Sequence, residues 1–363
     1  MQILNRPKAV VFENNCRENI KKLCKKADYL GADFRPHFKT HQSHVVGQWF
    51  ADQGVHGITV STPEMAAYFS KHGWNSITIA FPFYRQQIGD INKLTEHSAI
   101  RLFVQNSDDI HFLGEYLIHP VDLMIEIDAG YNRSGISYLE KDKINDLIST
   151  INESSNVSFK GFYIHDGGTY HVQGEKDVRK TIERDLNAFR ELRKQYPGVE
   201  FGLGDTPSSS LVEELYPVTE LSPGNLIFYD LMQIEIGSCS YKDLGLLVRV
   251  PVVQEKPYQD LCIIHGGAVH FSKERLRING GDTYGQPVVI DDDGNIQKIE
   301  GTSVTAISQE HGTVTGLKAL KAAYKTEHLS ELWVCPVHSC LTANLFETYI
   351  TPTGESIEKR VLS

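Results

Sequence analysis

Up to about residue 235, short runs of apolar residues alternate with longer amphipathic stretches. Each run is rich in β-branched or aromatic residues and bounded by Gly, Pro or Asp. It is also too short for a buried helix, so the pattern is typical of β-strands. The eight runs that we predict to be strands lie at 34–38, 56–60, 76–80, 100–104, 121–127, 159–164, 199–203 and 216–221.

The segments between these runs have the pattern of helices. Residues 15–30 place apolar side chains on one side and lysines on the other, and residues 174–196 form a long charged amphipathic stretch. Thr62 precedes Pro63 as an N-cap would. Strand and helix in alternation predict a (β/α)8 TIM barrel over residues 14–235. A doubly wound open sheet has the same local pattern, so spacing leaves both architectures open.

After about residue 235 helical periodicity largely disappears and strand-like runs follow one another. Residues 291–295 have the composition of a tight turn between two of them, and one short helix is expected near 316–326. We therefore predict a mostly β C-terminal domain over 236–363, to which we assign residues 1–13. The opening apolar run in that segment is compatible with either domain.

Composition narrows the functional class. The 363 residues are 40% hydrophobic and 23% charged, which is ordinary for a globular protein. The formal charge of −10 argues against nucleic-acid binding, which favours a basic face. We see no secretory signal and no apolar run long enough to cross a bilayer. Six scattered cysteines without framework spacing predict reduced thiols, hence a cytoplasmic location.

Lys39 is the first candidate for chemistry. It follows the first predicted strand, between Arg35 and His41, where barrel enzymes place reactive groups. Neighbouring positive charge and desolvation disfavour an ammonium ion and expose a nucleophilic amine. A solvated lysine in a basic turn is the competing interpretation, and on this segment alone it is the better one.

Two later strands end in glycine-containing loops with polar side chains. Arg133 lies between Gly130 and Gly135, in a tight loop that would present a guanidinium, although a structural ion pair with Asp128 fits equally well. Glycines at 167 and 168 would let the backbone approach a flat ligand, with His165 and Tyr170 on either side.

The seventh and eighth predicted strands are followed by loops rich in Gly, Ser and Thr. In barrels, such late loops bind phosphate through backbone amides and hydroxyls. Each loop alone is a weak signal, but two in the expected place are moderate support. The candidate residues are Thr206, Gly224 and Asn225.

His338 and Cys340 are the candidate metal ligands. In an extended segment, two residues that are two positions apart point to the same face. A thiolate beside an imidazole favours Zn2+ and leaves positions open for water or substrate. A hydrogen-bonded histidine and a half-buried cysteine at a strand end is the competing interpretation. The polar turn at 308–312 is a further source of a ligand.

Six segments in the same order along the chain carry a family resemblance. They resemble the metal-activated D-serine dehydratases and D-threonine aldolases among the alanine-racemase-like, fold type III, pyridoxal-phosphate enzymes. The likeness spans nearly the whole chain. The segments are RPHFKTH, EIDAGYNRSG, GLGDTPSSS, ELSPGNLIFYD, QEHG and HSCLTAN.

The resemblance implies a role for each candidate residue. Lys39 would hold pyridoxal 5'-phosphate as a Schiff base and act as the base at the substrate Cα. Arg133 would lie near the ring, and Tyr170 would be a partner for its pyridine nitrogen. The remaining implied roles are His165 at the ring, Thr206, Gly224 and Asn225 at the phosphate, and His338 and Cys340 on zinc.

The resemblance ranks D-serine dehydratase first, converting D-serine to pyruvate and ammonia, because D-threonine aldolases typically have Asp where this chain has Cys340. Ser222 departs from the histidine usual before the Pro-Gly-Asn turn, and the His165 loop differs too, so the substrate stays open. A D-threonine aldolase, an amino-acid racemase and a non-catalytic cofactor carrier are the alternatives. A racemase would need a tyrosine from the second domain, for which we consider Tyr241, Tyr258 and Tyr284. A homodimer is expected from the family.

Overall fold

The computed structural model describes residues 4–278 and 280–360. The chain divides into two compact units, one of residues Lys21–Gly224 and one of Met1–Ile20 with Asn225–Ser363. The β-rich domain expected over 1–13 and 236–363 includes residues 1–3, 279 and 361–363, which lie outside the described residues. We call the two units the barrel unit and the β-rich unit.

A ring of eight parallel strands forms the centre of the barrel unit. The sheet order is β2-β10-β9-β8-β6-β5-β4-β3, and a parallel bridge between His37 and Thr59 joins the segment after β2 to β3. This closure confirms the predicted barrel and excludes the open sheet. The strands are β2 (Asp33–Phe34), β3 (Ile58–Val60), β4 (Ser76–Pro82), β5 (Ala99–Val104), β6 (Val121–Asp128), β8 (Val157–Ile164), β9 (Glu200–Leu203) and β10 (Glu220–Leu221), with the short β7 (Ile136–Ser137) beside β6.

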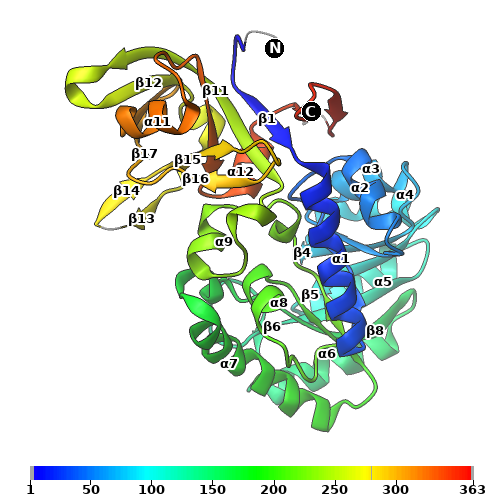
Figure 1. Cartoon of the computed structure of the whole chain (residues 1–363). Helices are drawn as coiled ribbons and strands as arrows, with labels where there is room; N and C mark the ends of the chain where they lie inside the picture. The colour runs from blue at the N-terminus through cyan, green and yellow to red at the C-terminus, as the bar shows by residue number, and fades with distance from the viewer. Residues whose placement is uncertain (1–3, 279, 361–363) are drawn as a thin grey trace. The chain divides into compact units, whose positions relative to one another are not determined.

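Helices lie around the outside of these strands (Figure 1). Thr62 is the N-cap of α3, as predicted, and its side chain accepts a hydrogen bond from the Met65 N–H. The helices are α1 (Glu13–Leu30), which runs from one unit into the other, α2 (His44–Ala51), α3 (Pro63–Ser70), α4 (Ile88–Thr95), α5 (Ser107–Tyr116), α6 (Lys141–Glu153), α7 (Gly174–Gln195) and α8 (Thr206–Leu211).

The β-rich unit is built on a mostly antiparallel sheet with the order β16-β15-β19-β11-β1-β20-β21, from which β12, β18 and β17 continue beside β11. Val250, Ile264, Val314 and Leu332 are among its fully buried core residues. The strands are β1 (Lys8–Val11), β11 (Leu246–Lys256), β12 (Leu261–His265), β13 (Leu276–Ile278), β14 (Gly281–Thr283), β15 (Gly285–Ile290), β16 (Ile296–Lys298), β17 (Ser303–Ile307), β18 (His311–Thr315), β19 (Glu331–Pro336), β20 (Thr348–Ile350) and β21 (Ser356–Glu358).

The expectation of one short helix after residue 236 was wrong. The predicted helix is present as α11 (Leu317–Tyr324), but α10 (Ala268–Phe271) and α12 (Ser339–Asn344) were missed, and α9 (Leu231–Ile236) lies at the beginning of this region. Each missed helix is too short for a helical period to be visible in the sequence. Both carry residues that matter below.

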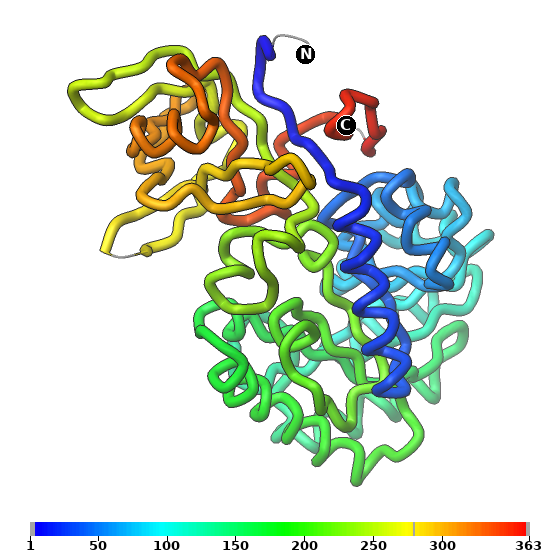
Figure 2. Tube along the Cα trace, in the orientation of Figure 1, coloured from blue at the N-terminus to red at the C-terminus, as the bar shows by residue number. Residues whose placement is uncertain are grey.

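The N-terminal strand β1 belongs to this second sheet. It pairs antiparallel with β11, where Val10 faces Leu247, and parallel with β20, where Val10 faces Ile350. Figure 2 shows the blue N-terminal segment running beside yellow-green and red segments from much later in the chain. The β-rich unit is therefore completed by residues from both ends of the sequence.

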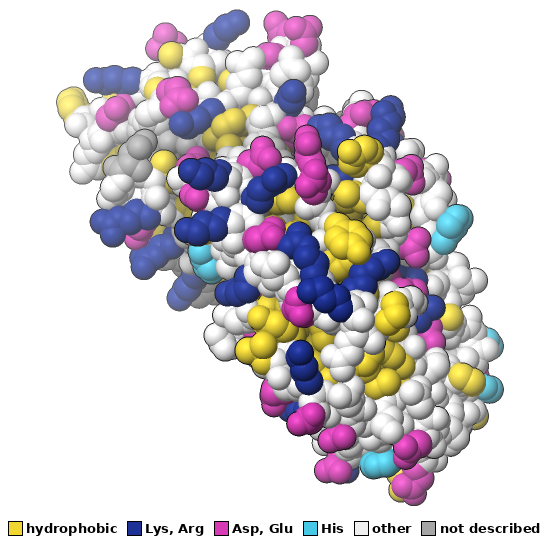
Figure 3. All heavy atoms as spheres, turned by 90° about the horizontal axis from the view of Figure 1, so that it is seen from below, with side chains coloured by type: hydrophobic (Ala, Val, Ile, Leu, Met, Phe, Trp, Pro, Cys, Tyr) yellow, Lys and Arg dark blue, Asp and Glu magenta, His cyan; other side chains and the backbone are white. Residues whose placement is uncertain are grey.

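Charges of both signs share the surface. Figure 3 shows both signs on one face, with Lys and Arg more frequent across the middle of the view and Asp and Glu more frequent toward its lower end. Within the described residues, no helix combines the length and apolar character required to span a membrane.

Candidate active site

The segment after β2 positions Lys39. Its neighbours Phe38 and Thr40 are buried, and the Phe38 N–H donates to the Thr59 carbonyl oxygen at 2.8 Å. The Lys39 N–H donates to His37 Nδ1 at 3.3 Å, and the Lys39 carbonyl accepts from the Gln42 side chain at 3.2 Å. The Lys39 backbone is thus fixed inside the fold while its side chain is exposed.

The structure brings Lys39, Arg133, His165 and His37 into electrostatic contact. Burial lowers the pKa of His37 well below its usual value, and the charges of Lys39 and Arg133 add to this effect. Burial, Arg133 and Lys39 likewise lower the pKa of His165 to about 3. Both imidazoles are therefore neutral at physiological pH.

His165 has a defined ring orientation. Its Nδ1 is bonded to the Gly204 carbonyl oxygen. Because a carbonyl only accepts, Nδ1 carries the ring proton and Nε2 is left as an acceptor. A Cβ on Gly204 would overlap the Tyr163 hydroxyl, so glycine is needed for this approach.

Thr206 and Tyr170 meet at the start of α8. The Thr206 N–H donates to the Tyr170 hydroxyl at 3.4 Å. Thr206 Oγ1 is buried and has no hydrogen-bond partner among the described residues. Asp205 caps the helix by accepting from the Ser208 N–H at 2.8 Å. A buried hydroxyl without a partner is costly, so this site is suited to a polar ligand group.

Gly224 and Asn225 have different surroundings. A Cβ on Gly224 would come within 2.8 Å of both the His37 carbonyl oxygen and Thr40 Oγ1, so the position has room for glycine alone. The Asn225 side chain instead donates to Asp230 Oδ2 at 2.6 Å and to Ser339 Oγ at 3.2 Å. Its contacts lie within the β-rich unit, and its phosphate role stays a prediction.

His338 and Cys340 are neighbours, but the segment is not extended as expected. His338 is the N-cap residue of α12, and Cys340 lies in the first turn of that helix. The helix begins there because the buried Asp230 carboxylate accepts the Ser339 N–H at 2.8 Å. This cap comes from a residue 109 positions earlier, so the local sequence does not show it.

Asp230 also faces His338. The distance from Asp230 Oδ2 to His338 Nδ1 is 3.4 Å, and the Asp230 side chain is fully buried. Burial by itself lowers the pKa of His338, but the Cys340 sulfur and Asp230 together raise it well above the usual value. The Asn225 amide donates to Cys340 Sγ at 3.6 Å. Sequence reasoning missed Asp230, whose only local signal is an Asp in front of the apolar residues of α9.

The residues present fit two kinds of ligand. Lys39, its cationic neighbour Arg133 and the unpartnered Thr206 hydroxyl suit an anionic aldehyde cofactor with a phosphate group. An imidazole and a thiol oriented by a buried carboxylate suit a soft divalent metal.

Comparison with known families agrees with this picture. Residues 13–231 match the family described as "Alanine racemase, N-terminal domain". The chain belongs to this family. Residues 245–351 match a second family, described as "Putative serine dehydratase domain". Together they confirm the fold type III resemblance drawn from the sequence motifs.

Individual relatives cover nearly the whole chain. A D-serine dehydratase of Dictyostelium discoideum is 27% identical over 374 residues, which covers 95% of this chain and 93% of the relative. The D-threo-3-hydroxyaspartate dehydratase of Delftia sp. HT23 is 25% identical over 358 residues. Its solved structure has a TM-score of 0.87 at 24% identity and covers 99% of this chain and 98% of its own.

A third protein has the same fold at lower identity. The D-threonine aldolase of Filomicrobium marinum has a TM-score of 0.80 at 19% identity and covers 98% of this chain and 94% of its own. For the Delftia enzyme, structures of a His-to-Ala variant and of a Cys-to-Ala variant "in the metal-free form" are also similar to this chain.

Proposed function

We propose that this protein is a pyridoxal-phosphate- and zinc-dependent lyase acting on D-β-hydroxy amino acids, with D-serine as its substrate and pyruvate and ammonia as its products. The observation that carries the proposal is Cys340 beside His338 in a chain that also holds Lys39 in the segment after the first barrel strand. The names of the relatives, two kinds of D-amino-acid dehydratase, support the same reaction class.

Lys39 would hold the cofactor through its ε-amine and, with substrate bound, take the Cα proton. When bound, pyridoxal phosphate supplies an electron sink for the charge left at Cα. Arg133 would keep a positive charge near the ring, while His165 and Tyr170 line it. Thr206 Oγ1 would donate to a phosphate oxygen, and Gly224 would allow the backbone to lie close to His37 and Thr40, in the segment that carries Lys39.

His338 and Cys340 would hold the metal, with Asp230 orienting the imidazole. A zinc ion held there supplies Lewis acidity toward the substrate β-hydroxyl, which makes hydroxide a better leaving group. The two substituted positions in the variants of the Delftia enzyme are two residues apart, like His338 and Cys340, and one variant is described as metal-free. This spacing supports a metal site here.

The proposal also includes an assembly and a location. A homodimer rests on the family resemblance, and sedimentation velocity of the purified protein tests it. A cytoplasmic location is supported by the six cysteines, which form no disulfide among the described residues.

A product assay tests the reaction. D-serine, D-threo-3-hydroxyaspartate and D-threonine would each be assayed for keto acid, ammonia and aldehyde, with D-alanine followed for racemisation. We expect keto acid and ammonia from D-serine in the native protein and neither product in the Lys39→Ala variant. Aldehyde with glycine from D-threonine would instead identify a retro-aldol lyase. Racemised D-alanine without keto acid from any substrate would overturn the lyase.

A further inference from the structure

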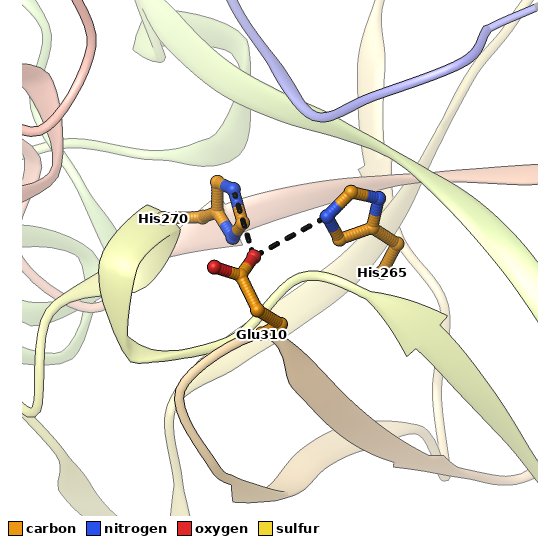
Figure 4. Close-up of side chains that lie close together, drawn as sticks. All are labelled: His265, His270 and Glu310. Carbon is orange, nitrogen blue, oxygen red and sulfur yellow. Dashed lines mark hydrogen bonds and ion pairs between the residues drawn. The ribbon is translucent and has the colours of Figure 1, made fainter.

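A second group of metal-ligand side chains lies in the β-rich unit. His265 ends β12, His270 lies in α10, and Glu310 lies in the turn between β17 and β18. Figure 4 shows the two imidazoles and the carboxylate turned toward one another. Their ligand atoms all lie within 4.8 Å of one another. Sequence analysis singled out the turn that holds Glu310 but neither histidine.

The backbone holds these three side chains in place. The Gly266 N–H donates to the Glu310 carbonyl oxygen at 2.8 Å, and the Ala268 N–H donates to the Ser308 carbonyl oxygen at 2.8 Å. The segment that carries the histidines is thus bonded to the turn that carries the glutamate. A Cβ on Gly267 would overlap the Gln309 carbonyl oxygen, so this approach requires glycine. Such support is what a preorganised ligand set needs.

The spacing of the ligand atoms suits a first-row divalent metal. His265 Nε2 lies 3.3 Å and His270 Nε2 lies 3.9 Å from Glu310 Oε2. Zinc binds imidazole nitrogen and carboxylate oxygen at about 2.1 Å, so tetrahedral ligand atoms lie roughly 3.4 Å apart. The two observed distances lie close to this value, and small side-chain rotations would equalise them.

The chemistry and exposure of the group also fit a metal. Two nitrogens and one oxygen form a ligand set that zinc uses with a fourth position open. The side chains of His265, His270 and Glu310 are 35%, 15% and 49% exposed, so water or a ligand can reach that position. The Gly267 N–H donates to His270 Nδ1 at 3.3 Å, and metal binding at Nε2 would move the ring proton to Nδ1, so this hydrogen bond would be lost.

We propose that His265, His270 and Glu310 form a divalent transition-metal site, with Zn2+ as the fitting ion, distinct from the pair of His338 and Cys340. The two places are connected within the β-rich unit. Thr342 of α12 donates to the carbonyl oxygen of Phe271 in α10 at 3.2 Å, and the His270 ring lies 6.1 Å from the Phe346 ring. A metal at the new site would link α10 to the β17–β18 turn. Helix α10 lies next to α12, the helix that carries Cys340.

Metal titration of the full-length holoenzyme tests the site. The protein would be stripped with chelator, dialysed and titrated with Zn2+ by calorimetry. The Cys340→Ala variant serves as the background, because it removes the thiolate site from the count. We expect one Zn2+ per chain in this background and none after the further change His270→Ala or Glu310→Gln. His328→Gln, which removes an exposed imidazole elsewhere in the same unit, should leave the stoichiometry at one.

Cobalt distinguishes the two sites by spectrum. A cobalt–thiolate bond absorbs in the near ultraviolet, whereas a site of nitrogen and oxygen ligands gives only weak visible bands. We expect the weak visible bands to survive Cys340→Ala and to disappear in Glu310→Gln. Circular dichroism and thermal unfolding show whether each variant is folded. A folded Cys340→Ala protein that binds no Zn2+, or a Glu310→Gln change that leaves binding unchanged, would overturn the site without affecting the proposed lyase.

Discussion

The two units gather reactive side chains in surroundings of opposite charge. In the barrel unit, Lys39 and Arg133 lie with the neutral imidazoles of His37 and His165. In the β-rich unit, the corresponding neighbour is a carboxylate, Asp230 at His338, and a second carboxylate lies between two further histidines. The first arrangement favours an anionic ligand and the second favours a cation.

The same residue type therefore behaves in opposite ways in the two units. Burial and nearby cations lower the pKa of His165 to about 3, so its ring stays neutral. At His338, burial acts in the same direction, but Cys340 and Asp230 outweigh it and raise the pKa. The sign of the neighbouring charge, rather than burial alone, decides what a buried histidine can bind.

Removing the barrel amine should have the largest effect. We expect Lys39→Ala to lower kcat by about 10³-fold or more, because it deletes both the cofactor attachment and the base at Cα. Turnover and the absorbance of the bound cofactor measure this. Lys71→Ala, a change to an exposed lysine of the same unit, should leave both unchanged; equal losses in the two variants would contradict the role of Lys39.

Removing the cation from the β-rich unit should have the next largest effect. Chelation, or His338→Ala, should lower turnover of D-serine by about 10²-fold or more, because the hydroxyl loses its Lewis acid. The cofactor absorbance should persist, since the barrel residues still hold it. Loss of the cofactor absorbance together with activity would show that cofactor binding depends on the metal site. His328→Ala, which removes an exposed imidazole elsewhere in the β-rich unit, is the matched control and should keep its activity.

The Thr206 hydroxyl tests the anion preference of the barrel unit. We expect Thr206→Val to weaken cofactor affinity by about 10- to 100-fold, because a hydrogen bond to a charged group contributes about 1.5–3 kcal/mol. Thr206→Ser, which keeps the hydroxyl, should restore most of the affinity. Equilibrium dialysis measures the cofactor affinity of each variant. An unchanged affinity in the valine variant would show that Thr206 does not bind the phosphate.

Asp185 shows that the difference in charge holds for the two sites and not for each unit as a whole. Burial, with the neighbouring Asp166, raises the pKa of this barrel carboxyl to about 8. The folded state then keeps a proton that the unfolded state loses above pH 4. The free energy of unfolding should therefore fall as pH rises from about 4 to 8. Asp185→Asn should flatten this slope by an amount on the order of 1 kcal/mol per pH unit, measured by urea unfolding at several pH values. The change Asp146→Asn, at an exposed position, should leave the slope unchanged. An unaltered slope in Asp185→Asn would contradict the raised pKa of Asp185.

The barrel could be predicted from the sequence because each of its strands is a short apolar run, buried on both faces. The runs at 34–38 and 216–221 were longer than the observed strands: the first shares Phe34 alone with Asp33–Phe34, and the second contains Glu220–Leu221. After β2, the chain leaves the regular ladder, and His37 makes a single bridge to Thr59. This irregular segment is the one that positions Lys39, and no local pattern marks where the strand ends.

The β-rich unit was harder to predict at the level of the site. The pair His338 and Cys340 was found by its spacing, but its helical conformation depends on Asp230, far earlier in the chain. His265 and Glu310 meet because the ends of β12 and β18 pair, where His265 faces His311. Contacts made by strand pairing leave no signal at a fixed spacing, so single-sequence reasoning does not detect them.

The position of β1 between β11 and β20 has a consequence for how the polypeptide is made. This strand is synthesised before the continuous segment of the barrel unit, whereas its partner strands are synthesised after that segment. During translation the barrel can therefore fold while β1 is still unpaired. The backbone hydrogen-bonding groups of an unpaired strand can associate with other nascent chains. A deletion that removes β1 would for the same reason damage the sheet at β11 and β20, although both strands lie more than 200 residues later in the chain.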